Sequence, residues 1–246
     1  MGFIVFSPNN LSVIKTRLWL NDDNLAEQNN FLILVEKEIE DYLLIEKTVL
    51  VNYHPGYFAL PSEIFRKDKL NYWTELLNGL NPIEKMLIKS TDDSDIVHIQ
   101  PIKKKFHEKL MQKYQDLSIF SFREFAFQRQ VYEKDTMCVT FQHQHIFITL
   151  YSKGTLQLNQ VYSFESPEDV IYLLLNITDH FFLDKSTLTF IPEGFVDADS
   201  VLYKLVEQYF PNMQLPDKIN YNYPEETEHL SPFILRYFDR IISCVS

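Results

Sequence analysis

Glycine is scarce in this chain: only 5 of its 246 residues are glycine, against 20 phenylalanines and 14 tyrosines. Glycine alone lets the backbone approach a bound phosphate closely with its amides turned inward, so this scarcity argues against glycine-rich phosphate loops. A serine nucleophile on a sharp, glycine-flanked turn is also absent from the sequence. Two glycine-based signatures of enzymes are therefore missing.

Cysteine is rarer still, with Cys138 inside an expected strand and Cys244 near the C-terminal end. Their spacing fits neither a disulfide framework nor a zinc site, so we expect two free thiols in a reducing compartment. Cys138 should be buried in its strand, which argues against a role as an exposed nucleophile.

Long apolar runs are missing as well. The richest stretch, residues 172–183, is interrupted by Asn176, Asp179 and His180, so we expect no membrane-spanning segment and no membrane partner. Residues 1–4 have no basic stretch and no long apolar region, so they do not match a secretory signal. Together these observations predict a cytoplasmic protein.

The net charge of the full chain is −11, and basic residues are few in its second half. Between residues 160 and 230 the only bases are Lys185, Lys204 and Lys218, set against many acids. A nucleic-acid phosphate backbone would be repelled there, so we expect no nucleic-acid partner for this half.

The clearest pattern lies between residues 137 and 210, where the hydrophobic period changes in a fixed order. Three alternating runs, joined by short turns at residues 142–145 and 152–155, predict antiparallel strands that end at Phe164. Ser166-Pro167, followed by acids, predicts a helix start. A strand at residues 188–191 and a helix at residues 199–210 complete the order, which is that of the ribonuclease-H-like and actin-like folds.

The first half of the chain predicts a similar order of elements. Strands are expected at residues 3–6, 11–20, 48–53, 57–60, 86–89, 96–101 and 117–122, and helical segments at residues 25–44, 62–77, 103–114 and 123–133. A last helix is expected at residues 232–242. We therefore predict a duplicated α/β fold, with one subdomain at residues 1–134 and a second, including the C-terminal helix, at residues 135–246.

Two short stretches, residues 57–65 (YFALPSEIF) and 164–172 (FESPEDVIY), together with Arg236-Tyr237-Phe238, resemble an uncharacterised bacterial family of about this length with an actin-like ATPase fold. The resemblance implies two subdomains, each with a mixed five-stranded sheet flanked by helices, and a cleft between them. It also implies a further strand upstream of Gly2. It supplies no activity, because the family has none assigned.

The resemblance allows ATP binding to be tested on the sequence. Active actin-like proteins cradle phosphates in one hairpin turn per subdomain, which would lie near Gly2 and at residues 142–145 here. They pack base and ribose against a glycine pair, which would lie at residues 191–195. None of the three places has the required glycines, and the two hairpins also lack the nearby acid. We therefore expect a pseudo-ATPase with no catalytic residue and no cofactor.

Metal sites are not supported by the remaining polar clusters. His143 and His145 lie near Cys138, but a metal needs three or four convergent ligands, so we interpret them as polar residues of a hairpin turn. The acids at positions 92, 93 and 95 resemble the start of a calcium loop without its later glycine and glutamate, so we expect a solvated loop. We therefore assign no metal ligand.

The sequence evidence for a nuclease site or an anion-binding site is equally weak. A ribonuclease-H-type site needs acids on the first and fourth core strands, and Asp135 and Glu193 lie beyond the expected strand ends. The basic run at residues 103–105 falls in the first turn of an expected helix, where cations are mildly unfavourable, so a solvated face is the simpler interpretation.

We therefore interpret the chain as a non-catalytic binding or assembly module with a degenerate actin-like ATPase fold and a protein partner of unknown identity. Its C-terminal aromatic stripe is interpreted as core, with partner docking as the alternative; its members are Phe233, Tyr237, Phe238 and Ile241. Two other hypotheses stay open: a nucleotide-binding enzyme with an atypical cleft lined by basic side chains, and a component of a secretion or pilus machine.

Overall fold

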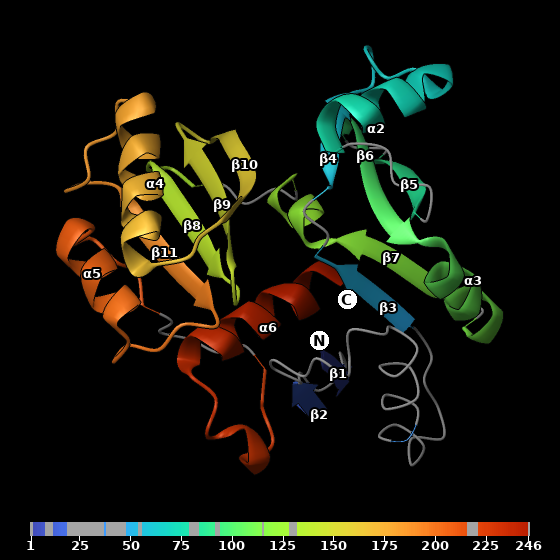
Figure 1. Ribbon diagram of the computed structural model, residues 1–246. Helices are drawn as coiled ribbons and strands as arrows, with labels where there is room; N and C mark the ends of the chain where they lie inside the picture. Colours follow the sequence, from blue (N-terminus) through green and yellow to red (C-terminus); the bar gives the residue numbers. More distant parts are fainter. Residues whose placement is uncertain are drawn as a thin grey trace. The chain divides into compact units, whose positions relative to one another are not determined.

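The computed structural model describes residues 2–7, 12–18, 37, 48–53, 56–78, 84–91, 94–114, 116–127, 132–215 and 221–245 (Figure 1). The chain divides into two compact units: unit 1 is Leu18–Glu124, and unit 2 is Gly2–Arg17 together with Phe125–Ser246. The predicted subdomains at residues 1–134 and 135–246 differ from these units in where residues 2–17 and 125–134 fall. That boundary stays a prediction.

Unit 2 contains a four-stranded sheet in the order β10-β9-β8-β11. Its strands are β8 (Thr136–Phe141), β9 (His145–Ser152), β10 (Thr155–Ser163) and β11 (Thr189–Gly194). The first three pair antiparallel and β11 pairs parallel with β8. Lys153 and Gly154 both have positive φ, at 51° and 75°, as a tight two-residue hairpin between β9 and β10 requires. The three predicted strands and the two hairpins are confirmed.

Two helices cover one face of this sheet (Figure 1). Helix α4 (Pro167–His180) begins with a capping box, in which the Ser166 side chain accepts from the Asp169 amide and the Asp169 carboxylate accepts from the Ser166 amide. Helix α5 (Val201–Tyr209) begins at Ser200, whose hydroxyl accepts from the Tyr203 amide. The predicted order of strands and helices is therefore confirmed through α5.

The core of unit 2 lies between this face and the two helices. Every second residue of β8 points into it, because side chains alternate across a strand. Fully buried members include Met137, Val139, Ile148, Leu150, Leu174, Leu188, Phe190 and Phe210. The other face of the same strands carries Cys138, Thr140, Thr149, Ile191 and Glu193, most of them polar and all of them buried.

The prediction of two five-stranded sheets is wrong for the described residues, whose sheets have two, four, two and three strands. In unit 2 the position of a fifth strand is occupied by a single parallel bridge between Phe190 and Met213. The Phe190 amide donates to Asn212 and the Phe190 carbonyl accepts from Gln214. Pro192, two residues along, faces the same side without an N–H to donate, so the pairing stops there.

Unit 1 contains two small sheets. Strands β3 (Thr48–Asn52) and β7 (Leu117–Ser121) pair in parallel. Strands β4 (Phe58–Pro61), β6 (Ser94–Lys103) and β5 (Glu84–Thr91) form an antiparallel sheet in that order. Its helices are η2 (Lys67–Lys69), α2 (Leu70–Asn78) and α3 (Lys104–Lys113), and α3 packs through Phe106 and Leu110 against Ile102.

The N-terminal strands belong to unit 2. Strands β1 (Gly2–Ser7) and β2 (Ser12–Leu18) pair with each other, and the Val13 amide donates to the Asn222 carbonyl. They pack near the last helix, α6 (Pro232–Val245), and a short helix, η4 (Glu225–Thr227), precedes it. The cluster that joins them consists of Val13, Tyr221 and Ile242, with Ile4, Phe6 and Tyr223 beside it.

Of two further predicted helices, one is wrong and the other lies almost entirely outside the described residues. The helix expected at residues 123–133 is wrong: the chain forms a 3-10 helix, η3 (Phe122–Phe127), and residues 132–135 are not helical. The reason is local, because the Glu124 carboxylate accepts from the Ser121 amide and holds a tight turn. The helix expected at residues 25–44 lies outside the described residues except for Lys37.

No helix in the described part of the chain is long and apolar enough to cross a membrane.

Candidate functional site

The hairpin expected to hold phosphate in unit 2 is a tight turn between β8 and β9. The Gln142 amide donates to the His145 carbonyl at 2.8 Å, and the side chains of His143 and Gln144 are exposed. The Gln142 side-chain amide donates to the Tyr237 hydroxyl of α6 at 3.1 Å. The first residue of the hairpin is therefore occupied by a contact within the protein.

The loop expected to pack a nucleotide base is tied to the same strand. Gly194 has φ +90°, and a Cβ at this position would overlap the Phe141 carbonyl oxygen and lie 3.1 Å from its amide nitrogen. The next residue, Phe195, donates its amide to the Phe141 carbonyl at 2.8 Å. The single glycine of this loop thus serves the close approach of β11 to β8.

Helix α6 joins these two places. The Tyr237 side chain is buried, its hydroxyl contacts Gln142, and its ring centroid lies 6.0 Å from that of Phe195. Phe233 and Phe238 are also buried, while Ile241 is half-buried, so three members of the predicted C-terminal stripe are confirmed as core. The positions where the resemblance puts phosphate and base are therefore linked by an aromatic side chain of the protein itself.

One turn further along α6, Arg240 forms a buried ion pair with Glu193 of β11. Glu193 also accepts from the Thr140 hydroxyl at 2.5 Å, and only 3% of its side chain is exposed. Burial alone lowers the pKa of Arg240, but the charge of Glu193 outweighs this and raises the pKa above its ordinary value. A charged pair is thus buried at the sheet face opposite the main core.

Two cysteines lie near the Arg240–Glu193 ion pair. Burial raises the pKa of the Cys138 thiol, and it also raises the pKa of Cys244 to about 11, against the opposing charge of Arg240. The Cys138 thiol lies 3.6 Å from the Tyr132 hydroxyl. Neither cysteine forms a disulfide and both thiols are protonated at neutral pH, so neither has the reactivity of a nucleophile.

The residues considered for nuclease chemistry are not brought together. Asp135 precedes the first residue of β8 and accepts from the Ser152 hydroxyl at 2.7 Å. Glu193 lies near the far end of β11, where it pairs with Thr140 in the parallel register. The two carboxylates therefore lie at opposite ends of neighbouring parallel strands, too far apart to share two metal ions.

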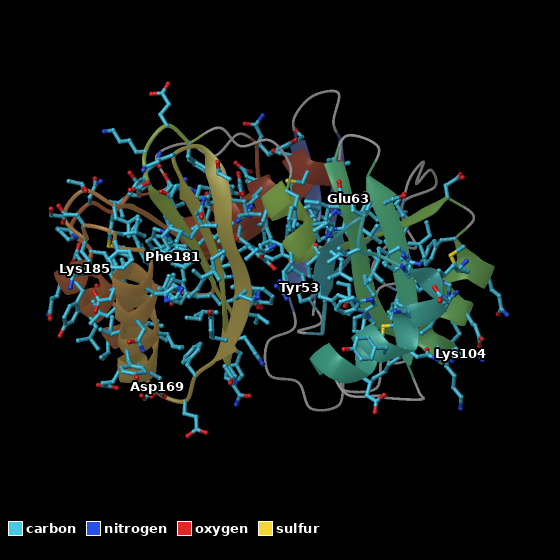
Figure 2. All side chains as sticks on the ribbon, turned by 90° about the horizontal axis from the view of Figure 1, so that it is seen from above. Tyr53, Glu63, Lys104, Asp169, Phe181 and Lys185 are labelled. Carbon is cyan, nitrogen blue, oxygen red and sulfur yellow. The ribbon has the colours of Figure 1, made fainter. Side chains whose placement is uncertain are left out.

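The polar clusters considered for metals and anions are dispersed. Cys138 pairs with Thr149, which lies four residues along β9 from His145. Among the described residues no group of three or more His, Cys, Asp or Glu side chains is placed to hold a metal ion. Asp95 belongs to β6, and positions 92 and 93 lie outside the described residues. The basic run ends β6 and begins α3 with exposed side chains, as Lys104 at the margin of unit 1 illustrates (Figure 2).

Unit 1 contains a buried polar cluster that the sequence did not indicate. The Tyr57 hydroxyl lies 2.6 Å from His98 Nδ1, and both side chains are buried. Arg123 donates to the Tyr57 carbonyl at 2.8 Å, and its guanidinium lies over the Tyr57 ring, 4.9 Å from the centroid. Val97, His98, Ile99 and Gln100 are all buried, so both faces of β6 are covered here.

Glu124 makes further hydrogen bonds in this cluster. Its carboxylate accepts from the Ser121 amide at 2.9 Å, from Lys89 at 3.1 Å and from the Gln100 side chain at 3.4 Å. Lys89 also lies over the Phe120 ring, 3.6 Å from its centroid. The buried carboxylate therefore has donors on several sides, which is the arrangement of a structural network.

The cluster predicts a pH dependence of stability. Burial, with the positive charge of Lys89, lowers the pKa of His98 from 6.5 to about 4. Between about pH 6.5 and 4 the unfolded chain binds a proton at this histidine while the folded chain does not, so stability is lost as the pH falls across this window. Urea unfolding between about pH 6.5 and 4 should show a smaller loss of stability for His98→Gln than for the wild type. An equal loss in both proteins would contradict the role of His98.

The comparisons with known proteins agree on the fold. The sequence profile of the family described as "Protein of unknown function (DUF3822)" matches residues 5–213. A protein of Bacteroides thetaiotaomicron VPI-5482, described as having an actin-like ATPase fold and unknown function, has a TM-score of 0.74 and 14% identity, covering 99% of this chain and 91% of that one. A chain of a PilM-PilN type IV pilus biogenesis complex has a TM-score of 0.61 and 8% identity, covering 100% and 95% respectively. No curated protein matches the sequence.

Proposed function

We propose a function from the premise that this chain belongs to the DUF3822 family of proteins of unknown function and has an actin-like ATPase fold. In this proposal the chain is a non-catalytic binding or assembly module whose nucleotide site has degenerated. Its partner is a protein, and it works in the cytoplasm, consistent with two cysteines that form no disulfide.

The observation that carries the proposal is the position of α6 in unit 2. Tyr237 contacts both Gln142 of the expected phosphate hairpin and Phe195 of the expected base loop. Arg240, on the same helix, has its charge neutralised by Glu193 and so is not available to a phosphate. A nucleotide bound at these two places would have to displace buried side chains and break a buried ion pair.

A protein partner is supported by one of the structural relatives. The similar chain of the type IV pilus protein is described as part of a PilM-PilN biogenesis complex, so the same fold occurs there in a protein assembly. The acidic charge of residues 160–230 favours a protein over a nucleic acid as the partner of this chain as well.

Calorimetry with Mg-ATP and with Mg-GTP tests the proposal. We expect no binding heat at nucleotide concentrations up to about 1 mM, which corresponds to a binding free energy weaker than about −4 kcal/mol. A nucleotide-binding actin-like ATPase measured under the same conditions is the positive control. A dissociation constant in the micromolar range for either nucleotide would overturn the degenerate-site proposal and favour the enzyme hypothesis.

A further inference from the structure

Strand β10 is the end strand of the unit 2 sheet, whose order is β10-β9-β8-β11 (Figure 1). An end strand presents a row of backbone N–H and C=O groups with which a further strand can pair. The register with β9 shifts between Leu156 and Leu158, so Gln157 is the extra residue of a bulge. The regular part of this sheet edge is therefore residues 158–163.

This edge lacks the features that keep other edges from pairing. Residues 158–163 contain no charged residue and no proline. The opposite edge of the same sheet carries the bridge between Phe190 and Met213, followed by Pro192. In the antiparallel sheet of unit 1, one outer strand carries two lysines and the other ends in proline. Lysine and proline protect edge strands, so β10 is the least protected edge of these two described sheets.

The directions of the backbone groups along β10 follow from one hydrogen bond. The Phe164 amide donates to the Gln144 carbonyl, on the side of β9. Backbone groups alternate in direction along a strand, so every second residue back from Phe164, including Gln160, directs its N–H and C=O toward β9. Asn159 and Val161 therefore direct theirs toward the outer edge.

The side chains of this edge alternate between the two faces of the sheet. Leu158 and Tyr162 are partly buried and pack against the main core of unit 2. Gln160 lies between them on the same face and is exposed. The order on this face is apolar, polar, apolar, and it is the same in both directions along the strand.

We propose that β10 pairs with β10 of a second copy of this chain, antiparallel about a two-fold axis at Gln160. This register places Leu158 opposite Tyr162 of the second copy on both sides of the axis, so apolar side chains meet apolar side chains. Asn159 and Val161 exchange backbone hydrogen bonds with the same residues of the second copy. The two four-stranded sheets then form one continuous sheet.

A second copy matches this edge better than a strand of another protein does. The order of side chains at Leu158, Gln160 and Tyr162 complements itself in antiparallel pairing. The segment offers no charge that would select a charged partner strand, and pairing it with itself brings no like charges together. The inference goes beyond the proposed function, because it does not depend on the state of the nucleotide site.

Sedimentation velocity of the full-length protein tests the pairing. We expect a dimer that dissociates on dilution. Gln160→Lys places two lysines opposite each other at the axis and should raise the dissociation constant by about tenfold or more. Thr155→Lys adds the same charge at the exposed start of β10, before the bulge, and should change the dissociation constant by less than about twofold.

Cysteine crosslinking tests the register. Gln160→Cys should form a disulfide between two copies on oxidation by air. Opposite residues of a non-hydrogen-bonded antiparallel pair have Cα atoms about 4.5 Å apart, which is within the range of a disulfide. Thr155→Cys and the wild type are the controls and should form no covalent dimer.

Folding of the variants is checked by urea unfolding at a dilution at which all of them are monomeric. Gln160 is exposed, so both of its variants should keep the midpoint of the wild type. A wild type that is monomeric at roughly 100 µM, or a dimer that Gln160→Lys leaves unchanged, would overturn the inference. A missing Gln160→Cys crosslink, or a monomer that pairs β10 with another protein, would overturn it too. Nucleotide binding by a dimer that Gln160→Lys dissociates would instead refute only the degenerate-site proposal.

Discussion

Replacing Arg240 with methionine is expected to lower the free energy of unfolding by about 3–5 kcal/mol. The substitution leaves Glu193 charged and buried, with a hydrogen bond from the Thr140 hydroxyl of β8. Only 12% of the Arg240 side chain and 3% of the Glu193 side chain are exposed, so water cannot solvate the remaining charge well. Urea unfolding of the wild type and the variant at neutral pH measures the difference.

A neighbouring arginine supplies the matched control. Arg236 lies one turn earlier on α6 and donates to the Gln214 carbonyl at 3.1 Å in an exposed contact, so Arg236→Met should lower stability by less than about 1 kcal/mol. The double variant Arg240→Met with Glu193→Met removes both charges and should recover part of the loss, since it leaves no unpaired ion. Losses that simply add in the double variant would show that the two side chains do not act as a pair.

Alanine at position 194 is the second substitution with a large expected effect. Gly194 has φ +90°, a conformation that costs an L-residue about 1–2 kcal/mol. The added Cβ would also overlap the Phe141 carbonyl oxygen, and relieving such an overlap by a backbone shift costs about 1–3 kcal/mol more. We therefore expect Gly194→Ala to lower the free energy of unfolding by about 2–5 kcal/mol, measured by urea unfolding.

A control at Gly154 distinguishes the cost of the backbone conformation from the cost of the steric overlap. It also has a positive φ, at 75°, but a Cβ built there meets nothing closer than 4.0 Å. Gly154→Ala should therefore lose only the conformational part, about 1–2 kcal/mol. If both alanine variants lost the same stability, the close approach between β11 and β8 would not be the reason for glycine at position 194.

Local signals in the sequence were sufficient for most of unit 2. The helix start at Ser166-Pro167 and the turn at residues 142–145 were predicted correctly because their causes are local: a capping box and a hairpin. The missing fifth strand could not be predicted in the same way. It depends on which edge of β11 Pro192 faces, and that is fixed only when Phe190 pairs with the segment around Met213.

The contents of the candidate site were less accessible to sequence analysis. From the sequence, Glu193 is considered only together with Asp135, as a candidate nuclease site, whereas its partner in the structure is Arg240, 47 residues away on another element. One signal was present: Arg240 falls on the same helical face as Phe233 and Tyr237, and a charged residue on a buried stripe needs a buried partner. Which acid supplies that partner follows only from the tertiary fold, as does the pairing of Tyr57 with His98.

The contact between the N-terminal hairpin and α6 has a consequence for synthesis of the chain. Val13 and Ile242 belong to one buried cluster, although they come from β2 and α6, far apart in the sequence. During translation the early strands emerge long before α6 exists, so their apolar residues stay without this cover. Unit 2 is therefore completed only by long-range contacts, and we expect its final folding step to be slow.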